Sequence, residues 1–330
     1  MNHLSIRVSR LFLTFWALVG LSIVASADES CLLNAFENAA PDTTVAELKQ
    51  QCGVTVIAVK DLGQQSNIQR RIRAERQAND RDYTITPHRP NYVLPVTYND
   101  NPNEAPFLPI DPNASVDSTE AHLQVSIKFP IAQNLWGTDT DLMLAYTNRA
   151  WWQVYNDDFS KPFRETNYEP EIFLRHFGGP SVLGLDVAGW DIGYAHQSNG
   201  RSEVLSRSWD RIVGQVFADI TQDLAVSLKA WYRLPEDDED DENPHMHRYL
   251  GYGEARFIYA PNKNTFTAMY RPGTQKQSFE LTWSYPITEH VRIYAQYFNG
   301  YGESLLDYDV RAERWGIGFA INDYLQRRAN

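Results

Sequence analysis

The stretch AHLQVSIKFP, residues 121–130, alternates apolar and polar side chains from end to end. In an extended chain, every second side chain points to the same side. One side therefore carries the apolar residues Leu123, Val125, Ile127 and Phe129. The other side carries Gln124, Ser126 and Lys128. This segment predicts a strand that has one face against an apolar medium and the other face in a polar one.

The same alternation returns later in the chain. It is clearest at residues 223–234, 278–285, 289–298 and 312–322. In all, about twelve such segments lie between residues 119 and 325. Strands of roughly ten residues joined by turns are typical of transmembrane β-barrels, whereas the strands of soluble β-sandwiches are usually shorter. We therefore predict an all-β fold, an antiparallel transmembrane barrel.

The composition excludes two other classes of protein. Apart from the N-terminus, no run of about 18 apolar residues occurs, and the mean hydropathy is −0.47, so a helical membrane protein is excluded. A transmembrane barrel is consistent with this low mean hydropathy, because only half of its strand residues face lipid. Aromatic residues make up 13% of the chain, as expected where tyrosine and tryptophan line the bilayer interfaces. The net charge of −12 argues against a nucleic-acid partner.

Residues 1–27 have the pattern of a secretory signal peptide. Arg7 and Arg10 precede an apolar run over Leu11–Val24, and the small residues Ala-Ser-Ala then form a cleavage site before Asp28. A transmembrane anchor is the alternative interpretation, but the apolar run is short for a span. We therefore expect an exported protein.

Three parts follow the signal peptide. Residues 28–98 predict an N-terminal periplasmic extension with short helices, of which the basic stretch QSNIQRRIRAERQ is expected to present a solvated face. Cys31 and Cys52 in this extension are expected to form one disulfide, with two free thiols as the alternative. Residues 99–118 are dense in Asn, Pro and Asp and predict a linker, and the barrel is expected over 119–330.

The stretch GYAHQSNGRSEVLSRSWDRIVGQVFADI, residues 193–220, carries the candidate chemistry. Alternation places His196 and Ser198 on one face together with Ile192 and Tyr194, and it places Asp210 on a face with Ile212 and Val216. If the apolar residues face lipid, the three polar residues do so as well, near the rim of the bilayer. Polar side chains that face lipid are usually functional. A serine, a histidine and an aspartate are the residue types that serve as nucleophile, base and orienting group in acyl transfer. The alternative is a polar rim where the strand leaves the membrane.

The motif HxSNGRSxxxSRSWxR, from His196 to Arg211, resembles the active-site signature of the outer membrane phospholipase A family. Further similar motifs are PFRETNYEP at 162–170, SYPIT at 284–288 and GYGESLLDY at 300–308. The resemblance extends from about His88 to Asp323. Motifs of this length are too specific to recur by chance.

The resemblance implies a twelve-stranded barrel that hydrolyses phospholipid esters on its lipid side. Ser198 would be the nucleophile and His196 the general base, and the backbone N–H of Gly200 would help stabilise the oxyanion. Asp210 stands where the family has an asparagine, so we expect it to orient His196.

The resemblance also implies calcium, bound when two barrels pair. The expected ligands are the Arg201 carbonyl, the Ser206 hydroxyl and the carbonyl of the partner subunit's Ser160, all oxygen donors as a hard cation requires. Glu203 stands where the family often has aspartate. The acidic loop EDDEDDEN could supply a second calcium ligand near Glu242, but such a run is more often a solvated loop.

These features together predict a calcium-dependent outer-membrane phospholipase, active as a homodimer. It would hydrolyse the sn-1 and sn-2 acyl esters of glycerophospholipids and also act on lysophospholipids. The alternative is a non-enzymatic barrel, either a small pore or an inactive relative. Twelve strands leave a narrow interior that side chains readily fill, which disfavours a pore. No GxSxG motif supports a soluble esterase.

Overall fold

The computed structural model describes residues 66–79, 84–157, 162–182, 184–237, 239 and 241–325, and positions 35, 38, 39 and 43. The predicted signal peptide, both cysteines and Ser160 lie outside the described residues. In the part that is described, no helix combines the length and the apolar character needed to cross a bilayer.

The described residues form fourteen strands and include the helices α3 (Asn67–Asn79) and α4 (Met246–Leu250). The first seven strands are β1 (Thr86–Pro87), β2 (Tyr92–Asn99), β3 (Thr119–Ala132), β4 (Thr140–Trp152), β5 (Phe163–Phe177), β6 (Ser181–Val182) and β7 (Leu185–Ser198). The other seven are β8 (Ser208–Asp219), β9 (Leu224–Arg233), β10 (Gly253–Tyr259), β11 (Thr265–Pro272), β12 (Gln277–Pro286), β13 (Arg292–Gly300) and β14 (Ala312–Ala320).

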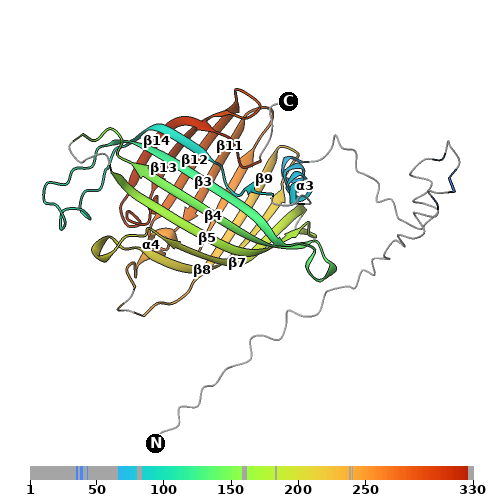
Figure 1. Ribbon diagram of the computed structural model, residues 1–330, viewed down its shortest axis with the longest axis horizontal. Coiled ribbons are helices and arrows are strands. Elements are labelled where there is room, and N and C mark those ends of the chain that lie inside the picture. The colour runs from blue at the N-terminus through green and yellow to red at the C-terminus, as the bar shows by residue number, and fades with distance from the viewer. Residues whose placement is uncertain are drawn as a thin grey trace, which may run out of the picture. The chain divides into compact units, whose positions relative to one another are not determined.

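These strands form one antiparallel sheet that closes into a barrel (Figure 1). Closure comes from the ladder between β14 and β2, because every other long strand pairs with its neighbours along the chain. The strands β1 and β6 have two residues each, so twelve strands of the described sheet make up the wall. The predicted twelve-stranded antiparallel barrel is confirmed.

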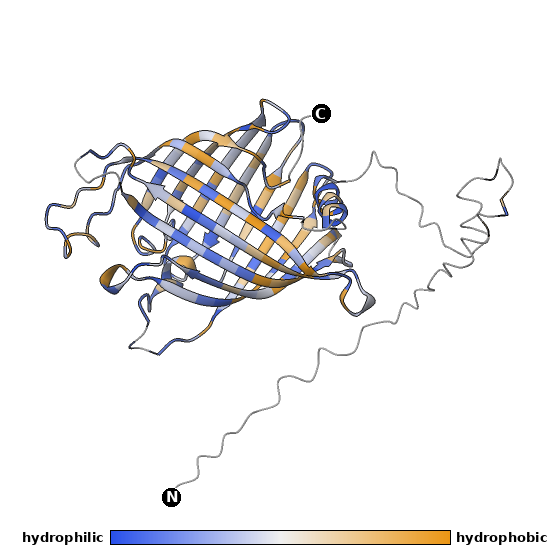
Figure 2. Ribbon diagram, in the orientation of Figure 1, coloured by the Kyte–Doolittle hydropathy of each residue, from blue (hydrophilic) through white to orange (hydrophobic). Residues whose placement is uncertain are grey.

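The two faces of the wall divide as the alternation predicts. Val125, Leu281 and Trp315 expose 49%, 50% and 51% of their surface on the outside. Ser126 and Lys128 are fully buried on the inside. Hydrophobic and hydrophilic residues accordingly alternate along the strands in Figure 2. The outer face is therefore apolar and the lumen polar, as a bilayer requires.

The predicted start of the barrel at residue 119 is wrong. Strand β2 lies in the stretch assigned to the periplasmic extension, yet it pairs with β14 and β3 and closes the wall. Its ladder shifts register between Leu94 and Thr97, around Pro95, which has no N–H to donate. Because of the bulge, Val93 and Val96 both face outward although they are three positions apart. The period of two is therefore broken, and the alternation does not predict this strand.

The stretch 99–118 is not a linker between domains. Its first residue ends β2, and residues 100–118 form the loop from β2 to β3. Phe107, Ala114 and Val116 of this loop are buried in an apolar cluster that also includes Leu205 and Leu306. The loop is therefore packed on one end of the barrel.

The two ends of the barrel differ in their connections. One end carries long loops, such as 199–207 between β7 and β8 and 234–252 between β9 and β10. The other carries short turns, such as 220–223 and 260–264. Helix α4 packs at the long-loop end, where Met246 and Leu250 join a cluster of Ala195, Trp209, Val213, Trp231, Leu305 and Tyr308.

Helix α3 packs at the short-turn end, where Figure 1 shows it beside β9. Its residue Ile68 is buried against Ala225 and Ile258 of the wall. The carboxylate of Glu75 forms ion pairs with Lys128, at 2.6 Å, and with Arg175, at 2.5 Å. The expectation of a solvated basic helix is therefore wrong for its inner face.

The Glu75 carboxylate is fully buried. Burial alone would raise its pKa, but Arg175 and Lys128 outweigh this effect and hold the pKa of Glu75 below its ordinary value. Lys128 is as buried as Glu75, and Glu75 is the acid with which it pairs. Each member of the pair therefore depends on the other to remain charged inside the lumen.

We predict that Glu75→Leu destabilises the barrel by about 3–5 kcal/mol, because it leaves the Lys128 ammonium buried without its counter-charge. The double variant Glu75→Leu/Lys128→Met should recover most of the loss. As a control, Arg76→Gln removes an exposed ion pair with Asp139 and should cost about 1 kcal/mol or less. Urea unfolding of the refolded barrel, followed by tryptophan fluorescence, measures all three. Equal stability of the single and double variants would contradict the interpretation.

Candidate active site

Strands β7 and β8 bring two of the candidate residues together. Their ladder pairs His196 with Asp210 and Ser198 with Ser208. His196 and Asp210 point outward, and their side chains are 36% and 33% exposed. The imidazole Nδ1 lies 2.8 Å from Oδ1 of Asp210. Residues 14 positions apart in sequence are thus joined by a hydrogen bond on the outer wall.

Tyr194 is a third member of this group. Its hydroxyl donates a hydrogen bond to the same Oδ1 of Asp210 that contacts His196. It lies two residues before His196 on the same outward face, with 37% of its surface exposed. In the sequence, alternation alone identifies Tyr194 as an outward-facing residue and indicates no role for it. Oδ1 of Asp210 therefore has two hydrogen-bond partners on the outer wall.

Ser198 lies on the same face as His196, two residues further along β7. Two steps along a strand correspond to about 6.6 Å, so the two side chains are neighbours. Among the described residues, no hydrogen bond joins the Ser198 hydroxyl to His196. Catalytic hydrogen bonds are often long without substrate and tighten when it binds. On the other side of Ser198, β5 places Tyr168 opposite it in the ladder.

Gly200 follows Ser198 at the start of the loop 199–207. Its φ of +64° lies in the left-handed region that favours glycine. A Cβ at this position would lie 3.1 Å from the ring of Tyr168, which is a tight contact. Glycine thus permits a left-handed turn close to the Tyr168 ring, directly beyond Ser198.

Asn199 holds the loop 199–207 in shape. Its side chain is buried and donates to the Leu205 carbonyl at 2.7 Å. Its Oδ1 accepts from the backbone N–H groups of Arg201, at 3.2 Å, and Arg207, at 3.1 Å. In the sequence, Asn199 is part of the motif from His196 to Arg211, and its structural role is visible only in the fold. The buried amide fixes both ends of the turn that carries Gly200.

The same loop carries two of the expected calcium ligands. The Arg201 guanidinium donates to the carbonyls of Phe163 and Arg164, so it is held by the neighbouring strand β5. In the described part of the chain, neither the Arg201 carbonyl nor the Ser206 hydroxyl is engaged in a hydrogen bond. Both are therefore available oxygen donors, which is the donor type that calcium requires.

The other expected ligands are not brought to this loop by a described contact. Ser160 lies outside the described residues. Glu242 lies in the loop between β9 and β10, where one of its carboxylate oxygens is buried without a hydrogen-bond partner. Within the described residues, no group of three or more His, Cys, Asp or Glu side chains is arranged to hold a metal ion. A calcium site at the loop 199–207 would therefore include carbonyl and hydroxyl oxygens.

Comparison with known proteins identifies the family. The family model described as phospholipase A1 matches residues 68–321, which include the whole barrel and most of α3. The chain belongs to the phospholipase A1 family. The resemblance found in the sequence is therefore confirmed, and so is the expectation of an outer-membrane phospholipase.

Several relatives support this assignment over most of their length. The chain is 36% identical to phospholipase A1 of Proteus vulgaris and 35% identical to that of Escherichia coli K12, in each case over 75% of this chain and 84% of the relative. The solved structure of outer membrane phospholipase A from Escherichia coli matches with a TM-score of 0.71 and 34% identity, over 76% of this chain and 97% of that one. A dimer of the Salmonella typhi enzyme with bound calcium matches with a TM-score of 0.69 and 33% identity, over 73% and 93% of the two chains.

We predict that Tyr194→Phe lowers kcat roughly fivefold and leaves KM nearly unchanged, because it removes one hydrogen bond, worth about 1 kcal/mol, from the carboxylate that contacts His196. Steady-state hydrolysis of a micellar phospholipid measures both constants. Tyr232→Phe is the matched control, since Tyr232 is an outward tyrosine of β9 that lies opposite Ile212 in the ladder. A loss of similar size in the control would show that the effect arises from the aromatic surface.

Proposed function

We propose that the protein is a calcium-dependent phospholipase that hydrolyses sn-1 and sn-2 acyl esters, and lysophospholipids, through Ser198, His196 and Asp210. The observation that carries the proposal is the 2.8 Å contact between His196 and Asp210, with Ser198 beside them on the outer wall. A hydrogen-bonded imidazole and carboxylate on a lipid-facing surface are costly without a function.

The residues divide the reaction between them. Asp210 accepts a hydrogen bond from Nδ1–H of His196, which leaves Nε2 free to accept a proton. His196 takes the proton of the Ser198 hydroxyl as the serine oxygen bonds to the ester carbonyl carbon, and then donates it to the departing alcohol oxygen. Water activated by His196 next cleaves the acyl-enzyme and regenerates Ser198. The Gly200 N–H donates to the oxyanion formed at each stage.

The position of the site suits a substrate that remains in the membrane. Ile192 and Ile212 expose 49% and 43% of their surface beside the catalytic residues, and the loop 199–207 begins directly after Ser198. Acyl chains would therefore lie against the apolar wall, with the ester at the depth where the wall meets the loops. Long loops face the exterior in outer-membrane barrels. The site is thus placed toward the outer leaflet.

The same rule orients the rest of the chain. Short turns face the periplasm, and α3 packs at the short-turn end. We therefore place the residues that precede α3 in the periplasm, after removal of the signal peptide 1–27. A small pore is disfavoured because α3, α4 and buried ion pairs occupy the lumen.

Calcium would be held by the Arg201 carbonyl and the Ser206 hydroxyl, with the carbonyl of the partner subunit's Ser160. When bound, the ion would polarise the water that stabilises the oxyanion. Glu242 is proposed as a second ligand because it retains a buried oxygen without a hydrogen-bond partner.

Homodimerisation would complete the calcium site, because one of the proposed ligands belongs to the partner subunit. Asn148 faces outward on β4, opposite Tyr168 of β5, on the wall that we propose contacts a second barrel.

We predict that Ser198→Ala and His196→Ala each abolish ester hydrolysis and leave the heat-modifiable barrel intact on a gel, because both act in chemistry and neither supports the lumen. Ser208→Ala and His290→Ala are the matched controls, since Ser208 is the ladder partner of Ser198 and His290 lies in an exposed turn. Full activity of either catalytic variant would rule out the assignment.

We predict that Asp210→Asn keeps substantial activity, whereas Asp210→Ala loses about a hundredfold, or about 2.7 kcal/mol of transition-state stabilisation. An amide oxygen can still accept from His196, but a methyl group cannot. Initial rates on one micellar phospholipid compare the variants. Wild-type activity of Asp210→Ala would show that Asp210 is only a rim carboxylate.

We predict that a chelator lowers both activity and dimer content, because the proposed ligands come from two chains. Cross-linking and hydrolysis are measured on the same sample with calcium and with chelator, and excess calcium should restore both. Ser206→Ala should raise the calcium concentration needed for half-maximal activity. Unchanged activity in chelator would remove calcium from the mechanism.

A further inference from the structure

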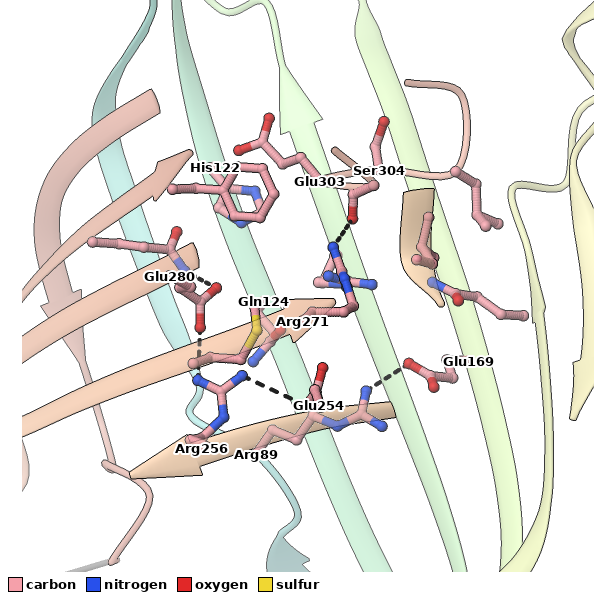
Figure 3. Close-up of a pocket in the computed structure, with 18 of the residues that line it drawn as sticks. Arg89, His122, Gln124, Glu169, Glu254, Arg256, Arg271, Glu280, Glu303 and Ser304 are labelled. Carbon is pink, nitrogen blue, oxygen red and sulfur yellow. Dashed lines mark hydrogen bonds and ion pairs between the residues drawn. The ribbon is translucent and has the colours of Figure 1, made fainter. Parts of the chain in front are cut away.

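A polar cavity of about 120 Å³ lies inside the barrel, on the lumen side of the wall. Figure 3 shows its side chains converging from several strands. Seven basic and four acidic side chains of the described residues line it, which is an excess of three positive charges. The catalytic residues are not among them, so this cavity is separate from the active site.

All four acids of the cavity form ion pairs with arginines, and Arg89 also pairs with Glu171, which lies outside the lining. The pairs are Glu169 with Arg89 and Arg211, Glu254 and Glu280 with Arg256, and Glu303 with Arg314. Figure 3 marks the contacts of Arg89 and Arg256. Every carboxylate that lines the cavity therefore already forms an ion pair with an arginine.

Three cations remain. Within the described residues, Arg149, Lys229 and Arg271 form no ion pair with a carboxylate. Arg271 donates from Nη2 to the carbonyls of Tyr301 and Gly302 at 2.8 Å, and its Nε has no partner. The Arg149 guanidinium lies 6.0 Å from the centre of the Trp151 ring. None of these contacts supplies a negative charge.

Two paired arginines of the cavity also retain unused donors. Nη1 of Arg314 and Nε of Arg211 are buried and have no hydrogen-bond partner, and these residues are only 2% and 5% exposed. A buried N–H of a charged group without an acceptor is costly. Arg149, Lys229, Arg271 and Arg314 come from β4, β9, β11 and β14, so the donors approach from different sides of the barrel.

We infer that this cavity is a binding site for a small inorganic oxyanion of the phosphate class. Such an ion offers several acceptor oxygens to donors that approach from different directions, and arginine binds phosphate oxygens in charge-assisted hydrogen bonds. A cavity of about 120 Å³ holds roughly eight waters, so one five-atom oxyanion fits with water around it. Chloride supplies charge but a single acceptor atom, and therefore matches this donor set less well.

The test uses the refolded full-length protein in detergent, with a chelator present so that phosphate cannot bind through calcium. Equilibrium dialysis with labelled inorganic phosphate is performed at constant ionic strength set by chloride. We expect one saturable phosphate per barrel, which sulfate displaces and added chloride does not. Absence of saturable binding, or equal displacement by chloride, overturns the proposal.

Variants locate the ion. Arg271→Gln and Lys229→Gln should each raise the dissociation constant for phosphate at least tenfold. Arg311→Gln should leave it unchanged, because Arg311 is exposed and pairs with Glu313 outside the cavity. Heat modifiability on a gel confirms that each variant is folded, and Arg149→Gln replaces any variant that is not. Wild-type phosphate affinity in the folded cavity variants overturns the site.

A second measurement does not depend on dialysis. Phosphate should raise the thermal midpoint of the wild-type barrel by more than that of Arg271→Gln at the same ionic strength, because only an ion bound to the folded state stabilises it. Ser198→Ala should respond as the wild type does, which separates this site from the catalytic wall. An equal rise in wild type and Arg271→Gln would reveal a general salt effect and contradict the inference.

Discussion

The ladder between β14 and β2 is the contact on which the rest of the structure depends. A bilayer offers no hydrogen-bond partner to a free strand edge, and each unsatisfied backbone group costs several kcal/mol there. Closing the sheet removes both edges at once. It also fixes which side of every strand faces lipid, because the side-chain period is two and a slip by one residue would exchange the faces. The outward position of His196, Ser198 and Asp210 is therefore a consequence of closure.

In a closed wall with an apolar exterior, the polar side chains of the opposite face all point into the lumen. The lumen is too narrow to hydrate all of them as bulk water would, so they pair across it. Arg164 contacts both Glu120 and Asp307, and Arg175 contacts both Asp191 and Glu75 of α3. With the ends packed by α3 and α4, the interior becomes a framework that holds the wall rigid. Chemistry on a large lipid substrate then has room only on the outer surface.

The period-two pattern was sufficient to predict most of the strands, their faces and the outward position of His196, Ser198 and Asp210. The pattern did not predict β2, because the bulge around Pro95 breaks the period. It also could not reveal the burial of α3, because Glu75 meets Arg175 a hundred positions away in sequence. Contacts of this kind are set by barrel register and leave no local signal. The alternation also placed Tyr194 on the outer face. Its hydrogen bond to Asp210 could not be predicted, because it depends on the pairing of β7 with β8.

Asp210 stands where the resemblance to the family implies an asparagine, and the hydrogen bonds at this position are compatible with either residue. Both recorded hydrogen bonds to Asp210 reach one oxygen, Oδ1, which an asparagine also possesses. The difference is therefore one of charge. A carboxylate at the membrane rim is costly alone, and the hydrogen bond that the Tyr194 hydroxyl donates lowers this cost. In the proposed mechanism, an imidazolium at His196 would lower it further. Tyr194 would thus make an ionised Asp210 tolerable on the outer wall.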